Sequence, residues 1–79
     1  MKHSTLTSIN NYVVHGIPTG GFLRAVLAND LMESMGRADI DNRRDLFEIV
    51  SYIYNSVPSD CHGSYELVDA WIERKGANR

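Results

Sequence analysis

The fold is decided by residues 16–36, which read GIPTGGFLRAVLANDLMESMG. Thr19 follows a turn at Pro18 and is a natural N-cap, and a nearly continuous helical pattern then runs to Met35 before Gly36. At 100° per residue, the apolar side chains of this segment occupy almost the whole circumference, which is typical of a helix enclosed on several sides. We therefore expect a central helix that ends at Gly36.

Asn29 and Asp30 interrupt this apolar pattern. On the helical wheel Asp30 falls between Leu23, Val26 and Leu27, which are core positions. Either an ionisable group points into the core, or the helix breaks near Asn29. The sequence leaves both alternatives open.

Three further helices flank the central one, and Gly and Pro separate them. The first covers residues 5–14, with Ser4 as its N-cap and Gly16 past its end. Another opens at Asp39 and runs to about Asn55, and the last covers about residues 64–76. The positions expected to face inward in these two helices are Leu46, Ile49, Val50, Ile53, Leu67, Val68, Trp71 and Ile72, with Phe47 and Tyr54 flanking the stripe.

Strand-like alternation is missing throughout, so the sequence predicts an all-α fold: a compact four-helix single domain that spans residues 1–79. Its ordered core covers about residues 5–75, and residues 76–79 form a solvated tail. A length of 79 residues leaves no room for a second core. By the scaling of surface with mass, such a chain exposes roughly 4,800 Å² when folded.

Composition excludes several classes of protein. The chain is 43% hydrophobic and 23% charged with a net charge of −2, and its apolar runs are too short to span a bilayer. The polar start at residues 1–5 does not resemble a secretion signal, so we expect a cytoplasmic protein. Cys61 is alone, which rules out an intrachain disulfide and favours a small buried hydrophobic residue.

No pattern of catalytic or metal-binding residues stands out. Cys61 and His62 are adjacent on a loop, without the paired spacing that zinc sites need and without the geometry of a thiolate nucleophile. Asp30 and Glu33 share a helix face but have no partner set for acid–base chemistry, and the glycines at 20–21 lack a phosphate-loop fingerprint. We therefore expect neither an enzyme nor a cofactor or metal site.

A candidate ligand site surrounds the start of the central helix. Thr19, Gly20 and Gly21 form a turn where free N–H groups can receive an anion, and Arg24 follows one turn later. With help from Arg24 or Arg37 and a stacking tyrosine, this turn would suit an anionic nucleotide. The alternative is that the two glycines only permit close helix packing.

A candidate partner surface follows from the charge distribution. Six acidic residues lie between Asp30 and Glu48 and meet only three arginines, which disfavours direct binding to duplex DNA. Arg37 lies beside Asp39 and Asp41, so we expect a capped turn with a surface ion pair there. The candidate partner-binding residues are Asn29, Asp30, Asp39, Asp41, Asp45 and Tyr52.

The chain also resembles a family of very small proteins encoded by phages, prophages and bacterial accessory regions. The resemblance covers about residues 12–76. It rests on residues 16–31, Gly36-Arg37-Ala38-Asp39, Asn42, Ile53-Tyr54-Asn55, Pro58, Cys61, Gly63-Ser64 and Trp71. What it implies is a phage-type accessory role, and such proteins are often inhibitors of host machinery or of antiviral defence.

These observations lead to three hypotheses. The first is a non-enzymatic binding protein that inhibits a host protein, a nucleoprotein complex or an antiviral-defence protein by contact. The second is an oligomeric sponge for an anionic nucleotide signal, since subunit boundaries create pockets that so small a chain lacks. The third, ranked last, is a DNA-binding regulator with Arg43 and Arg44 on a recognition helix.

Overall fold

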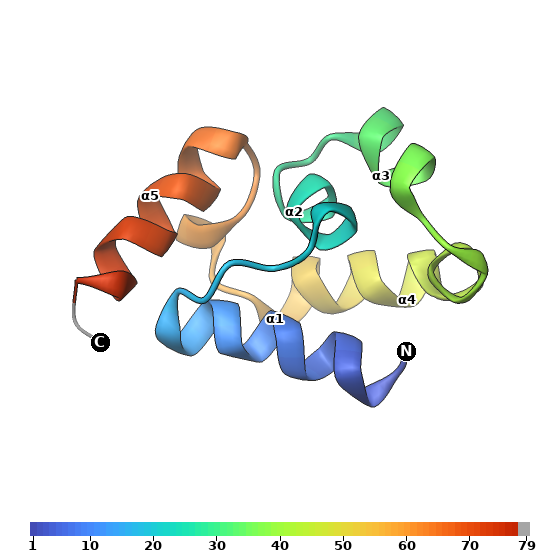
Figure 1. Ribbon diagram of the computed structural model, residues 1–79, viewed down its shortest axis with the longest axis horizontal. Helices are drawn as coiled ribbons and strands as arrows, with labels where there is room; N and C mark the ends of the chain where they lie inside the picture. Colours follow the sequence, from blue (N-terminus) through green and yellow to red (C-terminus); the bar gives the residue numbers. More distant parts are fainter. Residues whose placement is uncertain (78–79) are drawn as a thin grey trace.

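The computed structural model describes residues 1–77, and every regular element within them is helical (Figure 1). The elements are α1 (His3–His15), α2 (Gly21–Leu27), α3 (Leu31–Arg37), α4 (Ile40–Ser56), a short 3₁₀ turn η1 (Ser59–Cys61) and α5 (Tyr65–Gly76). The all-α prediction is confirmed. The count of four helices is wrong, since the described residues form five α-helices. Residues 78–79 of the expected tail lie outside the described residues.

The expected central helix is two helices with a break between them. Asn29 has a φ of 62°, in the left-handed region, and ends the path of α2. Asp30 then caps α3: its side chain accepts a hydrogen bond from the N–H of Glu33 at 3.2 Å, and its carbonyl accepts one from Ser34. Of the two alternatives at Asn29 and Asp30, the structure has the break. As a cap, the Asp30 carboxylate has a hydrogen-bond donor close by in the sequence. In a continuous helix it would lie among core residues and lose its contact with water.

The predicted starts of two helices are also corrected. Gly20, not Thr19, is the N-cap of α2, and the Thr19 hydroxyl donates to the Gly20 carbonyl at 3.1 Å. The N-cap of α1 is Lys2 rather than Ser4, and its side chain makes no capping hydrogen bond. The end of α1 is as predicted, because Gly16 adopts a left-handed φ of 67° and donates to the Tyr12 carbonyl.

The two later helices begin where the sequence predicted. Asp39 accepts from the N–H of Asn42 at 2.8 Å to begin α4, and Ser64 accepts from the N–H of Leu67 at 3.1 Å to begin α5. The inward stripe is narrower than expected: Ile49 and Ile53 are buried on α4, and Val68 and Trp71 on α5. Val50 and Leu67 are exposed, as are both residues that flank the α4 stripe.

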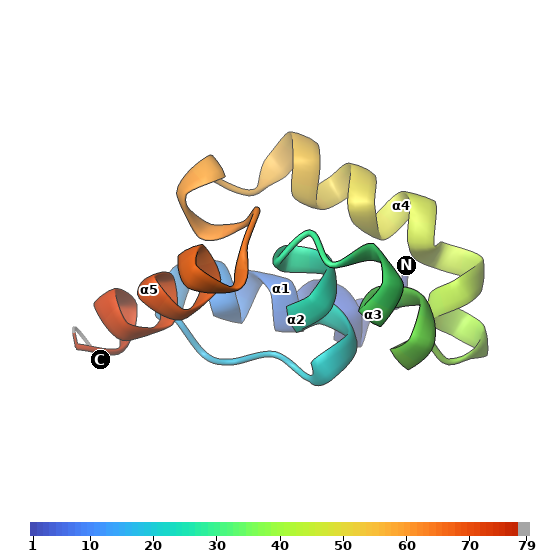
Figure 2. The ribbon, with the colours of Figure 1, turned by 90° about the horizontal axis from the view of Figure 1, so that it is seen from above.

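The core lies where α1, α2, α4 and α5 meet, and three long-range hydrogen bonds from the side chains of Tyr12 and Trp71 close it. The hydroxyl of Tyr12 donates to the carbonyl of Cys61 at 2.6 Å, and the Trp71 indole donates to the carbonyls of Tyr12 and Val13 at 3.1 and 3.2 Å. Cys61 is fully buried, as predicted. The surface area is 5004 Å², near the expected value. Figure 2 shows α4 along one edge of the molecule, with α2 and α3 together facing it.

Candidate functional site

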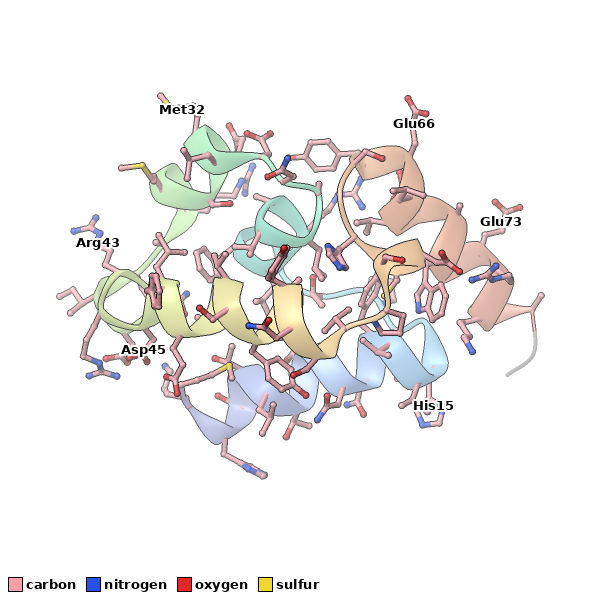
Figure 3. The ribbon with its side chains drawn as sticks, turned by 180° about the vertical axis from the view of Figure 1, so that it is seen from behind. His15, Met32, Arg43, Asp45, Glu66 and Glu73 are labelled. Carbon is pink, nitrogen blue, oxygen red and sulfur yellow. The ribbon has the colours of Figure 1, made fainter. Side chains whose placement is uncertain are left out.

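Seven large apolar side chains are exposed on two neighbouring helices. They are Leu31, Met32 and Met35 of α3 and Ile40, Phe47, Val50 and Tyr54 of α4, and we call them the α3–α4 face. Ile40, Phe47 and Tyr54 repeat every seven residues and therefore lie along one side of α4. Phe47 is 86% exposed and Met32 is 79% exposed, so these side chains contribute little to the core. Figure 3 shows Met32 projecting away from the body of the molecule.

The area of this face is unusual for a small protein. At about 150–250 Å² for each aromatic side chain, Phe47 and Tyr54 alone expose on the order of 300 Å², and the five other apolar side chains add to this area. The largest apolar patch on a typical monomer covers about 300–600 Å², and larger ones mark interaction sites. The α3–α4 face is thus the part of the described surface that most needs a partner.

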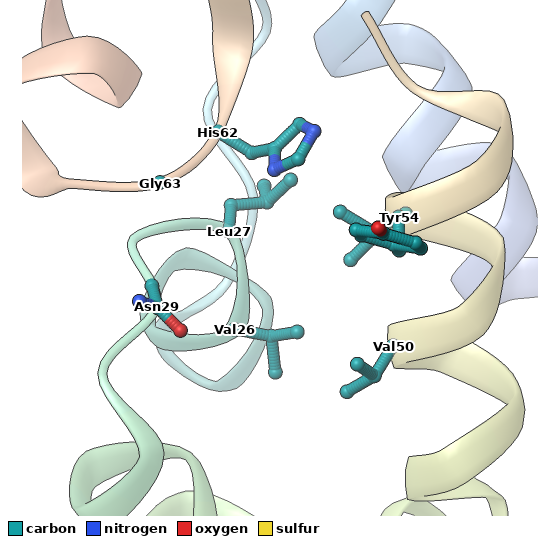
Figure 4. Close-up of a pocket in the computed structure, with 8 residues that line it drawn as sticks. Val26, Leu27, Asn29, Val50, Tyr54, His62 and Gly63 are labelled. Carbon is teal, nitrogen blue, oxygen red and sulfur yellow. The ribbon is translucent and has the colours of Figure 1, made fainter. Parts of the chain in front are cut away.

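A groove borders this face. A hollow of about 270 Å³ adjoins a smaller one of about 120 Å³, and both are lined by Val26, Asn29 and Val50. Because they share these three residues, the two hollows are neighbours between α2 and α4, and we call the pair the α2–α4 groove. Figure 4 shows Val26 and Leu27 on one wall and Val50 and Tyr54 on the other, with the His62 ring at one end.

Two hydrogen bonds fix the wall of the groove opposite α4. The N–H of Gly63 donates to the Leu27 carbonyl at 2.7 Å, which ties the loop before α5 to the end of α2. The Tyr65 hydroxyl donates to the Asp30 carboxylate at 2.7 Å and holds the break between α2 and α3 against α5. This bond to Asp30 raises the pKa of Tyr65, so the tyrosine remains a donor at neutral pH. One wall of the groove, at the end of α2, is therefore held by these two hydrogen bonds, and α4 forms the other wall.

A second hollow gathers part of the expected ligand site. Gly21, Arg24, Glu33, Arg37 and Tyr65 line a cavity of about 280 Å³, which we call the arginine pocket. Three of the five predicted ligand residues thus lie together with a tyrosine, as the sequence indicated. Gly20 lines a different, hydroxyl-rich hollow of about 330 Å³ between the starts of α1, α2 and α4, and Thr19 lines neither.

Both guanidinium groups of the arginine pocket already have carboxylate partners. Arg24 binds Asp69 through two hydrogen bonds of 2.6 and 3.2 Å and lies 4.9 Å from the centre of the Tyr65 ring. The same contact holds the pKa of Asp69 below its usual range. Arg37 pairs with Glu33 at 2.8 Å, one turn back on α3, and not with the acids at 39 and 41 as the sequence suggested. An anion in this pocket would have to displace one of the carboxylates.

The acidic residues expected to bind a partner are similarly occupied. Asp30 and Asp39 cap helices, and Asp41 pairs with Lys2 at 3.1 Å. Asp45 binds Arg44 at 2.9 Å, which lowers the pKa of its carboxyl group. The Tyr52 hydroxyl donates to Asn10 at 2.9 Å across to α1. Of the six predicted partner residues, only Asn29 and Asp30 line the α2–α4 groove.

Sequence reasoning missed the α3–α4 face, although one signal for it was available. The prediction of one enclosed central helix implies that Leu31, Met32 and Met35 are core residues. The seven-residue repeat of Ile40, Phe47 and Tyr54 could have indicated a second apolar strip on α4.

The Cys61 thiol and the residue types that bind metals bear on nucleophilic and metal chemistry. Burial raises the pKa of the Cys61 thiol to about 11, so the thiol is protonated at neutral pH and is a poor nucleophile. Within residues 1–77, no three histidine, cysteine or carboxylate side chains are grouped to hold a metal ion. No described helix combines the length and apolar character required to cross a membrane.

No family model, no curated protein and no solved structure matches this chain.

Proposed function

We propose that this protein is a non-enzymatic, phage-type accessory protein that inhibits a host or antiviral-defence protein by direct contact through the α3–α4 face. The observation that carries the proposal is the exposure of seven large apolar side chains beside a groove. The phage-type role comes from the resemblance of the sequence to small phage and prophage proteins.

The size of the face suits a specific protein contact. A standard interface buries about 800 Å² on each partner, and the seven exposed apolar side chains of the α3–α4 face would supply part of that area. Its aromatic and methionine side chains are of the kinds enriched in interface cores. Asp41 and Asp45 of α4 already form ion pairs within the chain, with Lys2 and Arg44. They would therefore attract a partner only weakly and would suit the rim of the interface.

The test compares two serine variants of exposed helical residues. Phe47→Ser removes an anchor from the α3–α4 face, and Val14→Ser removes an exposed side chain from α1, outside the face. Tagged wild-type and variant proteins capture binding proteins from a bacterial lysate, and each captured protein is then purified and titrated. We expect a partner that wild type and Val14→Ser bind and that Phe47→Ser loses at least tenfold in affinity. Equal capture by all three proteins would refute the role of the face.

The second candidate function is the nucleotide sponge, and the arginine pocket is the observation that favours it. Arg24, Arg37 and the Tyr65 ring lie around one hollow, which combines cationic groups with a surface for stacking. Release of Arg37 from Glu33 costs little, because an exposed pair of this spacing contributes about 0.3–0.5 kcal/mol.

Native mass spectrometry of gently purified protein tests the sponge. A small anion that is retained by wild type and by Arg43→Ala but lost from Arg37→Ala would support this candidate. Protein that carries no retained mass, and that shows no heat of binding with ATP or AMP in calorimetry, would count against it.

A further inference from the structure

We propose that, before the protein meets its target, the α3–α4 face is covered by the same face of a second copy of the chain. The two copies pair about a twofold axis at Phe47, and Arg43 of each copy binds Asp30 of the other. This inference rests on the proposed function, because it concerns the same surface and makes the second copy and the target compete for it.

Two opposite charges on this side of the molecule have no ion-pair partner within residues 1–77. Asp30 lines the smaller hollow of the α2–α4 groove, and its two oxygens accept hydrogen bonds from the Glu33 N–H and the Tyr65 hydroxyl, neither of which is a cation. Each carboxylate oxygen can accept a further bond. Arg43 is exposed, and its guanidinium group forms no ion pair or hydrogen bond with a described residue. One chain therefore carries both members of a pair.

Arg43 lies in the exposed apolar strip of α4 and not at the groove of its own chain. It is four residues before Phe47 and seven before Val50, spacings that place all three on one side of the helix. Val50 lines both hollows of the groove, and seven residues of helix separate it from Arg43 by about 10.5 Å. Figure 3 shows Arg43 on the edge of α4 nearer to α3, and Asp45 on the opposite edge.

Antiparallel pairing of two copies of α4 brings the opposite charges together. With the axis at Phe47, residues equally far before and after it lie at the same level, so Arg43 of one copy faces Ser51 of the other. Ser51 is one residue from Val50, at the wall of the other copy's groove. The twofold rotation leaves both grooves on the same side of the helix pair, so Arg43 can reach the other copy's Asp30 and bind it with two hydrogen bonds. The symmetry forms this pair twice.

The same axis matches the apolar side chains of the strip. Ile40 and Tyr54 are each seven residues from Phe47, so Ile40 of one copy meets the Tyr54 ring of the other, and the two Phe47 rings meet at the axis. A spacing of seven residues is the repeat with which helices pack against one another in coiled coils. The strip on α4 is therefore suited to a helix that carries the same strip.

The apolar area of the face agrees with what a stable dimer needs. A standard interface buries about 800 Å² on each partner, of which about 450–520 Å² is apolar. Phe47 and Tyr54 expose on the order of 300 Å². The five other side chains are 46–80% exposed and add about 200–400 Å², at roughly 60–120 Å² for each complete side chain. Two such faces can thus form an interface of standard size.

Sedimentation equilibrium of the full chain at low salt tests the pairing with two charge-reversed variants. We expect the wild type to form a dimer at micromolar concentration. Arg43→Asp and Asp30→Arg should each dimerise at least tenfold more weakly, because each places like charges together at both contacts. An equimolar mixture of the two variants should regain the wild-type affinity, because the heterodimer has opposite charges at both contacts.

Two further variants keep this test interpretable. Glu73→Arg is the matched control, since it reverses an exposed charge on α5 outside the face, and it should dimerise like the wild type (Figure 3). If circular dichroism shows that Asp30→Arg is unfolded, Asp30→Asn takes its place, because asparagine is as good a helix cap. Asp30→Asn removes the charge alone and should weaken the dimer at least threefold.

A cysteine at the axis tests the position of the two helices. In Phe47→Cys the two introduced thiols lie within reach of a disulfide, so a mild oxidant should cross-link the copies. Val14→Cys is exposed on α1 outside the face and should remain monomeric on a non-reducing gel. The native Cys61 is fully buried, so the wild type should not be cross-linked. Equal cross-linking of the two variants would overturn the axis.

The remaining outcomes separate this inference from the proposed function. A wild type that stays monomeric at millimolar concentration, or a dimer that neither charge variant weakens, would overturn the inference. If such a monomer still captures a target that Phe47→Ser loses, the occupant of the face is the target and the proposed function stands. A dimer with the expected charge dependence, and no captured protein that depends on Phe47, would support the inference and count against the proposed function.

Discussion

Substitution of Tyr12 by phenylalanine should cost about 2 kcal/mol of stability, because it leaves a buried carbonyl without a donor. Tyr12 is fully buried, and its hydroxyl donates to the Cys61 carbonyl at 2.6 Å, which joins α1 to the turn before α5. A buried acceptor that loses its donor costs about 1–3 kcal/mol. For a domain of this size, 1 kcal/mol shifts the melting temperature by about 4–8 °C, so we expect a decrease of about 8–16 °C.

Urea denaturation followed by Trp71 fluorescence and by circular dichroism measures the loss. The matched control is Tyr52→Phe, which removes a surface hydroxyl that donates to Asn10 at 2.9 Å and should cost less than about 1 kcal/mol. If the two variants lose the same stability, or if Tyr12→Phe loses less than about 0.5 kcal/mol, then the buried bond does not hold α1 in place.

Gly16→Ala should lower the free energy of unfolding by more than about 1 kcal/mol in urea denaturation, because φ is 67° and an added Cβ would lie 2.5 Å from the Cβ of Lys75. A variant as stable as the wild type would contradict the packing of α1 on α5. In urea denaturation, the free energy of unfolding of Asn29→Ala should be about 1 kcal/mol lower than that of Asn29→Gly, since φ at this residue is 62°. The reverse order would argue against the break. Raising the pH from 8 to 10 should lower the free energy of unfolding by about 1.8 kcal/mol, because the Cys61 thiol ionises near 8.5 when unfolded but holds its proton to about 11 when folded. The unfolded state then binds fewer protons, so stability falls as the pH rises; Cys61→Ser should lose this slope, and a slope that persists would assign it to another group.

The helices with strong local signals were predictable from sequence. One helix opens at Asp39 as predicted, and the last helix begins near Ser64, where its start was expected. The segment around Asn29 was ambiguous because helix propensity alone does not decide between a buried carboxylate and a break. In the structure the Asp30 carboxylate takes part in the local cap and also accepts a bond from Tyr65, a residue 35 positions further along the chain that a local pattern does not reveal.

The candidate sites were predictable in part, and for a similar reason. The sequence proposed Gly21 with Arg24 or Arg37 for one site, and in the structure all three line the arginine pocket. It did not reveal that Asp69, 45 residues from Arg24, neutralises that guanidinium group. The α3–α4 face depends on which side of each helix the rest of the chain covers, and a local pattern carries no such information.

The indole of Trp71 has a consequence for how the chain acquires its structure. It completes the end of α1 by bonding to the Tyr12 carbonyl across 59 residues of sequence. During synthesis, α1 leaves the ribosome before α5 exists. The side chains that α1 buries in the finished protein, Ile9 and Tyr12, then have no complete core to pack against. Closing so long a loop is an entropic cost that must be met before these contacts form, so we expect folding in one late and cooperative step. A nascent chain halted within α4 should therefore be degraded by proteases that spare the finished protein.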